Sequence, residues 1–171
     1  KKIEIVRLAQ VRDIFGFCCL TGLAFTDVQQ LKPEHIVTDI NGTKWIRKAR
    51  QKTRNMCNIP LLDAARKILA RYEDNPYCQV HGVLLPVCSN QKMNAYLKEL
   101  ADICGIRKNL STHCARHTFA TLTLASGATI ENVAKMLGHA NTNMTRHYVR
   151  ILDSSIVRDM QTVAKNMALE S

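Results

Sequence analysis

The chain has 171 residues, 46% of them apolar, which suits one domain with a buried core and excludes a wholly disordered tail. Its 24 Lys and Arg against 14 Asp and Glu give a net charge of +10, which predicts an anionic partner such as nucleic acid or a membrane surface rather than a small neutral substrate. No apolar run approaches the roughly 20 residues that cross a bilayer, and the start lacks the apolar stretch of a signal peptide, so we expect a soluble, cytoplasmic protein.

The first 31 residues predict two helices. Apolar residues recur at helical spacing over residues 5–20, and Gly22 follows as a stop signal. Thr26 is then expected to cap a short helix that ends at Leu31, just before a proline.

A small antiparallel sheet is predicted next. Its strands are expected at 35–40, 44–50 and 56–61, with Asn41 and Gly42 as the hairpin turn between the first two.

The second half of the chain changes to a helical pattern. Gly105, Gly127 and Gly138 fall where C-terminal caps belong. The fold class is therefore α+β, mainly α: a helical domain over 1–171 with one three-stranded antiparallel sheet, in which 153–171 forms a C-terminal packing helix and tail. Helices are predicted at 63–73, 90–104, 112–126, 130–137, 143–151 and 154–168.

The seven cysteines show no CxxC pair, and their odd number makes a disulfide framework or a zinc finger an unfavourable interpretation. Cys18, Cys19 and Cys104 have apolar neighbours, where free cysteine behaves as a small hydrophobic residue. We interpret them as packing residues.

The densest basic stretch, residues 44–54, holds six basic residues and no acidic one. Lysines also protect exposed strand edges from aggregation, so a solvated edge is one interpretation. The other is phosphate binding, because Lys48, Arg50 and Lys52 would project together from one face of an extended strand. The residues predicted to bind DNA here are Arg47, Lys48 and Arg54.

A second cluster lies in STHCARHTFATLTLASG. Ser111 or Thr112 can cap a helix whose N-terminus attracts anions, and His113 and Arg116 are neighbours on its first turn, which predicts a phosphate site. Two alternatives are that His113 and His117 bind zinc or that the histidines are buried structural groups. The zinc interpretation lacks the glutamate of HExxH and a third ligand.

The third cluster is LGHANTNMTRHYVRI, in which Gly138 ends a helix, His139 follows it, and Tyr148 comes nine residues later. Most tyrosines in a late helix belong to the core or its rim, so this spacing alone indicates no chemistry.

Together these elements resemble the catalytic domain of tyrosine recombinases, the phage-type integrases. The resemblance rests on the order of TGLxxxD at 21–27, Lys52 in a hairpin, HxxRH at 113–117, LGH at 137–139 and Tyr148. It implies a site-specific recombinase or integrase whose partners are double-stranded DNA and other protomers in a synaptic tetramer, in the cytoplasm of a bacterium and without a membrane.

The resemblance assigns the phosphate chemistry to three residues. Tyr148 would attack the scissile phosphate and form a 3′-phosphotyrosyl link, leaving a 5′-hydroxyl. Arg116 and His139 would donate hydrogen bonds to the nonbridging oxygens as negative charge grows in the transition state.

It assigns proton transfer and support to three more. His113 would assist proton movement at the tyrosine and the phosphate, Lys52 would protonate the departing 5′-oxygen as general acid, and Asp27 would support the site. A phenol with an ordinary pKa of about 10 is a poor nucleophile at pH 7, so cations and a histidine must favour its deprotonation. The resemblance implies neither a metal nor another cofactor.

One position departs from the family. The arginine that follows TGL in the family is replaced by Ala24, and we expect Arg50 to substitute for it, because Arg50 lies two residues before Lys52 and would share its strand face. TGLA followed by the aromatic Phe25 resembles the integrases of Bacteroides-type mobile elements.

Two other functions stay open beside recombination. One is relaxation of DNA in the manner of a type IB topoisomerase, and the other is a catalytically silent DNA-binding protein, because of Ala24. Recombinases of this family usually carry an N-terminal helical DNA-binding domain, so we expect the chain to be a fragment that lacks it. The last predicted helix has an apolar stripe and packs either on its own domain or on a neighbouring protomer.

Overall fold

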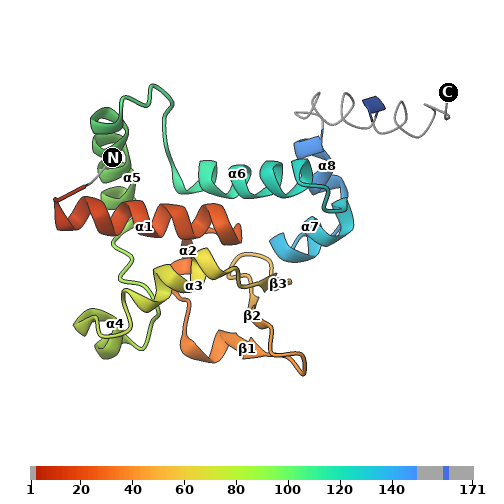
Figure 1. Ribbon diagram of the computed structural model, residues 1–171, viewed down its shortest axis with the longest axis horizontal. Helices are drawn as coiled ribbons and strands as arrows, with labels where there is room; N and C mark the ends of the chain where they lie inside the picture. The colour runs from red at the N-terminus through yellow and green to blue at the C-terminus, as the bar shows by residue number, and fades with distance from the viewer. Residues whose placement is uncertain (1–2, 150–159, 162–171) are drawn as a thin grey trace, which may run out of the picture.

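The computed structural model describes residues 3–149 and 160–161. Helix α1 lies beside α6, α5 stands against α1, and the three-stranded sheet with α3 lies on the opposite side of α1 from α6 (Figure 1). The helices are α1 (Val6–Thr21), α2 (Phe25–Gln29), α3 (Asp63–Ala70), α4 (Pro76–His81), α5 (Asn90–Cys104), α6 (Thr112–Ala125), α7 (Ile130–Leu137) and α8 (Asn143–Val149). A 3₁₀-helix, η1 (Pro33–His35), precedes the strands β1 (Ile36–Thr38), β2 (Lys44–Ala49) and β3 (Met56–Pro60). The predicted α+β, mainly α class is confirmed.

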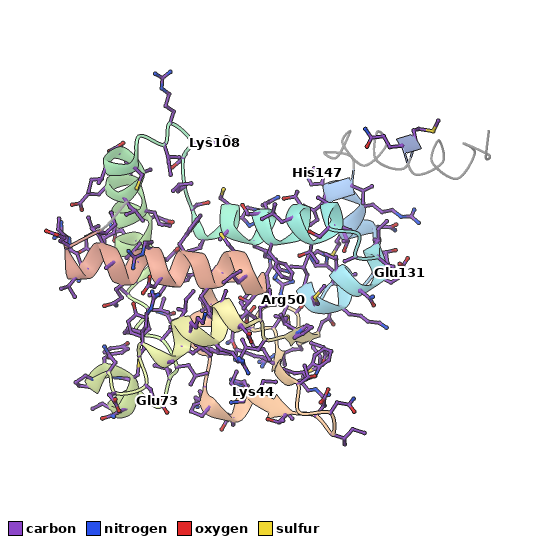
Figure 2. The ribbon with its side chains drawn as sticks, viewed as in Figure 1. Lys44, Arg50, Glu73, Lys108, Glu131 and His147 are labelled. Atoms are coloured by element: carbon purple, nitrogen blue, oxygen red, sulfur yellow. The ribbon has the colours of Figure 1, made fainter. Side chains whose placement is uncertain are left out.

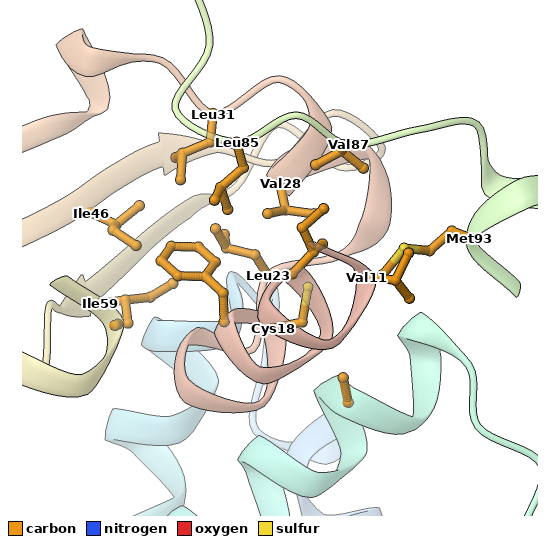
Figure 3. Close-up of a cluster of buried hydrophobic side chains, with 14 of the residues drawn as sticks. Val11, Cys18, Leu23, Val28, Leu31, Ile46, Ile59, Leu85, Val87 and Met93 are labelled. Carbon is orange, nitrogen blue, oxygen red and sulfur yellow. The ribbon is translucent and has the colours of Figure 1, made fainter. Parts of the chain in front are cut away.

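Helix α1 is the centre of the main core. Its inward side chains, among them Val11, Phe17 and Cys18, are at most 2% exposed and pack against Ile46 and Ile59 of the sheet (Figure 3). The helix ends where predicted, because Gly22 takes a left-handed φ of 67° and its N–H donates to the carbonyl of Cys18 at 2.8 Å. None of the helices within the described residues is long and apolar enough to cross a membrane.

The predicted cap at Thr26 is wrong. Helix α2 begins at Phe25, and Ala24 is its N-cap residue, with extended backbone and no side-chain hydrogen bond. Leu23 and Val28 are both fully buried, so hydrophobic packing on either side of the turn places the helix start, and the exposed Thr26 lies in the first turn.

The sheet has the predicted order β1-β2-β3, with both pairs antiparallel. β1 is shorter than expected because η1 takes up the preceding residues. β2 ends at Ala49, after which the chain turns: the N–H of Arg50 donates to the carbonyl of Asn55 and the N–H of Arg54 donates to the carbonyl of Arg50, both at 2.9 Å. Arg54 has a positive φ of 63°.

The predicted row of Lys48, Arg50 and Lys52 on one exposed strand face is wrong, because the strand ends before Arg50. Lys48 shares its strand face with the buried Ile46 and is itself only 7% exposed. The side chain of Arg50 is 11% exposed, and Lys52 lies in the exposed turn. The face that carries Lys48 and Arg50 therefore looks into the protein, because the same parity that aligns them also aligns them with the core.

Among the helices, α5 and α7 have the predicted bounds, and α3 ends three residues early. Helix α4 was not predicted, although Asn75 accepts hydrogen bonds from its first turn, Pro76 opens it and Gly82 closes it. The predicted helix at 154–168 lies outside the described residues, except for 160 and 161.

The cysteine prediction holds in part. All seven thiols are free. Burial raises the pKa of Cys18 to about 12 and that of the half-buried Cys19 to about 11, as expected of packing residues. Cys104 is exposed, contrary to prediction; it is the last residue of α5, beyond the buried residues of that helix.

Candidate active site

Arg116 of α6 forms hydrogen bonds to the C-terminal ends of α1 and α7. Ser111 caps α6 by accepting the N–H of Cys114 at 3.2 Å, and the side chain of Arg116, in the second turn, is directed inward and 5% exposed. Its Nη1 donates to the carbonyl of Gly22 at 2.6 Å, and its Nη2 donates to the carbonyl of Leu137 at 2.7 Å. Both carbonyls lie at helix C-termini, where the helix dipole favours a cation.

His139 lies beside this guanidinium. Gly138 ends α7 with a φ of 61°, and the following turn brings His139 Nε2 to 3.3 Å from Nη2 of Arg116. The other ring nitrogen, Nδ1, is 2.8 Å from Oγ1 of the buried Thr145. Burial, Arg116 and Arg50 together lower the pKa of His139 to about 4, so its imidazole is neutral at pH 7.

Tyr148 is 6% exposed and lies among histidines. Its ring is parallel to that of His139, with ring centroids 6.5 Å apart. It makes an edge-to-face contact with the His117 ring, with ring centroids 5.0 Å apart. His117 Nε2 is 2.7 Å from Nε2 of the exposed His113, so one proton is shared by the two imidazoles. Burial lowers the pKa of His117, and the nearby His113 adds to this effect.

His113 and Arg116 have different contacts in the structure, and their joint phosphate site stays a prediction. The two residues are one helical turn apart, but Arg116 turns inward to the carbonyls of α1 and α7, whereas His113 stays at the surface and contacts His117. In the part of the chain that the structure describes, no group of three His, Cys, Asp or Glu side chains could hold a metal ion, and the His113–His117 pair has no third ligand of that kind.

Arg50 reaches the same place from the sheet. Its Nε is 3.8 Å from Oδ2 of the buried Asp27, whose Oδ1 accepts the N–H of Gln51 at 2.8 Å. Figure 2 shows Arg50 near the C-terminal end of α1 and close to α7, and a Cβ placed on Gly138 would come within 2.8 Å of Arg50 Cδ. Arg50 Nε is buried and has no hydrogen-bond acceptor among the described residues.

The fold thus gathers five of the ten predicted residues, and four others, His113 among them, are exposed. Arg50, Arg116, His139, Tyr148 and Asp27 are in or next to one cluster. Three predicted residues are exposed on or beyond β2, and in the described residues their side chains make no hydrogen bond or ion pair to this cluster: Arg47, Lys52 and Arg54.

Two contributors were missed by the sequence analysis. Thr145 orients His139, and the backbone N–H of Gln51 holds Asp27. Thr145 lies three residues before Tyr148, a spacing that places both on one helix face and could have pointed to it. The contact of Gln51 is made by backbone, which no side-chain pattern reveals.

The electrostatics of the cluster favour an anion. Two guanidinium groups and a neutral imidazole are opposed by one carboxylate, and burial together with Arg50 lowers the pKa of Arg116. A bound phosphate would relieve this repulsion and give the orphaned Nε of Arg50 an acceptor.

Comparisons with known proteins show the family of the chain. The sequence profile described as the phage integrase family matches residues 6–155. The tyrosine recombinase XerD of Listeria innocua serovar 6a is 30% identical over 145 residues, which cover 77% of this chain and 46% of XerD. This chain therefore spans less than half the length of that relative.

Solved structures share the fold at lower sequence identity. A XerH site-specific recombinase bound to a palindromic difH substrate, in a post-cleavage complex, superposes with a TM-score of 0.68 at 21% identity, covering 86% of this chain and 43% of XerH. A lambda integrase dimer bound to a COC′ core site gives a TM-score of 0.62 at 17% identity, covering 82% of this chain and 52% of the integrase.

Proposed function

This chain belongs to the phage integrase family, and we propose that it is the catalytic part of a site-specific recombinase that cleaves and rejoins DNA through a 3′-phosphotyrosyl intermediate. The observation that carries the proposal is the convergence of Arg50, Arg116 and His139 beside Tyr148, with Asp27 as the one opposing charge. Its substrate is double-stranded DNA, and its partners are further protomers in a synaptic tetramer.

In the proposed cleavage step, the phenol oxygen of Tyr148 attacks the scissile phosphorus. A bond from that oxygen to phosphorus forms, the bond from phosphorus to the 5′-oxygen breaks, and the electron pair leaves on the 5′-oxygen. Arg116 uses two of its five N–H donors on helix carbonyls, which fixes its plane and leaves other donors for the nonbridging oxygens. His139 donates to the same oxygens once its Nε2 carries the proton, with Thr145 donating to Nδ1.

Proton transfer runs through groups on either side of the phosphate. The phenol proton passes to the His113–His117 pair, since the ring of His117 touches Tyr148 and its Nε2 meets that of His113. Lys52 protonates the 5′-oxygen as general acid. Its exposed position at the tip of the β2–β3 turn allows it to reach into bound DNA, and Arg47 and Arg54 contact the DNA backbone from the same hairpin.

Arg50 takes the place of the arginine absent at position 24. The methyl group of Ala24 cannot bind a phosphate, whereas Arg50 is close enough to the cluster to affect the pKa of both Arg116 and His139. Asp27 supports it by holding both the guanidinium and the turn that follows.

Covalent trapping on a nicked suicide DNA substrate tests the proposal. The wild-type protein should form a DNA adduct that survives denaturation, and Tyr148→Phe should bind the same DNA without forming it. Tyr96→Phe is the matched control and should form the adduct like wild type. An adduct that persists in Tyr148→Phe and maps to another tyrosine contradicts the assignment.

The role of Arg50 has its own test, single-turnover cleavage at saturating protein. Arg50→Ala should cleave bound DNA roughly 10²-fold more slowly or worse, as expected for a lost transition-state contact, and Ala24→Arg in that background should recover part of the rate. Cleavage by Arg50→Ala at the parent rate would show that Arg50 contacts DNA only at a distance.

We further propose that the protein acts in the cytoplasm of a bacterium as the integrase of a Bacteroides-type mobile element, on the strength of TGLA followed by Phe25. Joining of two separate DNA sites is the expected product. Relaxation of supercoiled plasmid without joining would instead favour the topoisomerase alternative, and failure of both would favour a silent DNA-binding protein.

A further inference from the structure

A cavity outside the candidate active site is lined by residues of α2, η1 and β2. Its volume is about 310 Å³, enough for a tetrahedral oxyanion with some water at about 30 Å³ per water molecule. It is formed where the end of α2, η1, β2 and the segment after α4 meet. Its lining residues are Gln29, Gln30, Lys32, Glu34, His35, Lys48 and Val83.

Lys48 is the most unusual residue of this cavity. The residue is only 7% exposed, but its Nζ is not among the fully buried polar atoms without a partner in the described part of the chain, so the ammonium group is accessible from the cavity that Lys48 lines. Lysine is seldom covered to this extent in folded proteins. Its three N–H donors are therefore available to whatever enters the cavity.

The neighbouring groups add donors of the same kind. Nδ1 of His35 accepts the backbone N–H of Lys32 at 2.9 Å, so a neutral His35 carries its proton on Nε2 and is a donor there. Lys32 contributes a second ammonium, and Gln29 and Gln30 contribute amide groups.

One acidic residue, Glu34, also lines the cavity, but it is exposed and is outnumbered by the two lysines. Burial lowers the pKa of His35, and the charges of Lys48 and Lys32 lower it further against the opposing effect of Glu34. The positive charges near the imidazole of His35 therefore outweigh the one negative charge of Glu34.

From the mostly covered side chain of Lys48 and the donors that surround it, we propose that this cavity binds a phosphate group. The phosphate could belong to the DNA backbone or to a free phosphate-bearing molecule, and the chemistry of recognition is the same. The DNA source rests on the proposed function: Lys48 lies near the end of β2, and Arg50 is the first residue after that strand, so the cavity is next to the proposed active site in the chain. That proximity would suit a phosphate neighbouring the scissile one.

The first experiment uses inorganic phosphate and the whole chain, without DNA. The imidazole resonances of His35 are followed by NMR as phosphate is added at constant ionic strength. We expect a saturable change and an upward shift of the pKa of His35, reproduced by sulfate and not by chloride. A change that is absent, or linear in phosphate to high concentration, overturns the proposal.

Two variants assign the effect to the cavity. Lys48→Met keeps a long unbranched side chain and removes the charge, and it should weaken the response of His35 at least about tenfold. Lys44→Met removes the same charge from an exposed position on the same strand and should leave the response unchanged. Equal responses in Lys48→Met and wild type would overturn the proposal, and the wild-type titration decides the case even if that variant folds poorly.

The second experiment separates the two sources of phosphate. Single phosphates flanking the cleavage site are replaced one at a time by neutral methylphosphonates. If the ligand is DNA, one replacement should weaken binding of wild type several-fold and have no effect on Lys48→Met. If no position shows this coupling while inorganic phosphate still saturates His35, the ligand is a free phosphate. Because the first experiment needs no cleavage, loss of the proposed recombinase function would leave its result intact.

Discussion

Replacing Gly138 by alanine should damage both stability and the position of Arg50. Gly138 has a φ of 61°, where an L-residue with a Cβ costs about 1 kcal/mol more than glycine. The new Cβ would also lie 2.8 Å from Arg50 Cδ and 2.9 Å from Cys57 Sγ. Cys57 is 1% exposed and packed in the core, so the arginine must move, and overpacking of this kind costs about 1–3 kcal/mol. Together the two effects predict a loss of about 2–4 kcal/mol.

Gly105→Ala supplies the matched control. Gly105 ends α5 with a similar φ of 71°, but a Cβ there would meet nothing within 4 Å, so only the backbone cost of about 1 kcal/mol applies. Urea unfolding at 25 °C measures both variants, and single-turnover adduct formation measures the effect on Arg50. We expect Gly138→Ala to lose at least about 1 kcal/mol more than Gly105→Ala and to react at least about tenfold more slowly. Equal loss of stability in the two variants, or a parental rate in Gly138→Ala, would refute the placement of Arg50 against Gly138.

Three further predictions concern pH, a buried carboxylate and salt. The pKa of His139 is lowered to about 4 by burial, Arg116 and Arg50, so the unfolded chain binds more protons than the folded chain between about pH 6.5 and 4. The free energy of unfolding, measured with urea, should therefore fall as pH is lowered through that window, and His139→Gln should reduce this pH dependence. Asp13 is 7% exposed and accepts hydrogen bonds from Arg12 and Arg71, so Asp13→Asn should lower the free energy of unfolding by about 1–3 kcal/mol in the same assay. No measurable loss of stability would show that the carboxylate is not needed to hold the two arginines. Binding of this chain to duplex DNA should weaken steeply with salt, because phosphate contacts release counterions, and a flat dependence measured by fluorescence anisotropy would contradict the phosphate contacts proposed here.

The sequence by itself determined the local structure and the chemical types at the site. Apolar periodicity with a following glycine predicted the bounds of α1, α5 and α7 to within one residue. Both the buried face of a helix and its left-handed end depend on residues that are close in sequence. The phosphate chemistry of Tyr148 and His139 came from the resemblance of the ordered motifs HxxRH, LGH and Tyr148 to tyrosine recombinases, since the spacing of Tyr148 alone indicates no chemistry.

The tertiary structure decided which of those side chains meet and which face the solvent. Arg116 reaches the carbonyl of Gly22, 94 residues away in sequence, and turns away from the nearby His113. Strand parity correctly grouped Lys48 with Arg50, but parity cannot tell the buried face of a strand from the exposed one. That choice depends on α2 and η1 packing across the sheet, which places Arg50 against Asp27 and closes Lys48 into a cavity. Spacing along a chain fixes relative orientation over a few residues, whereas burial and charge pairing depend on packing between elements that are distant in sequence.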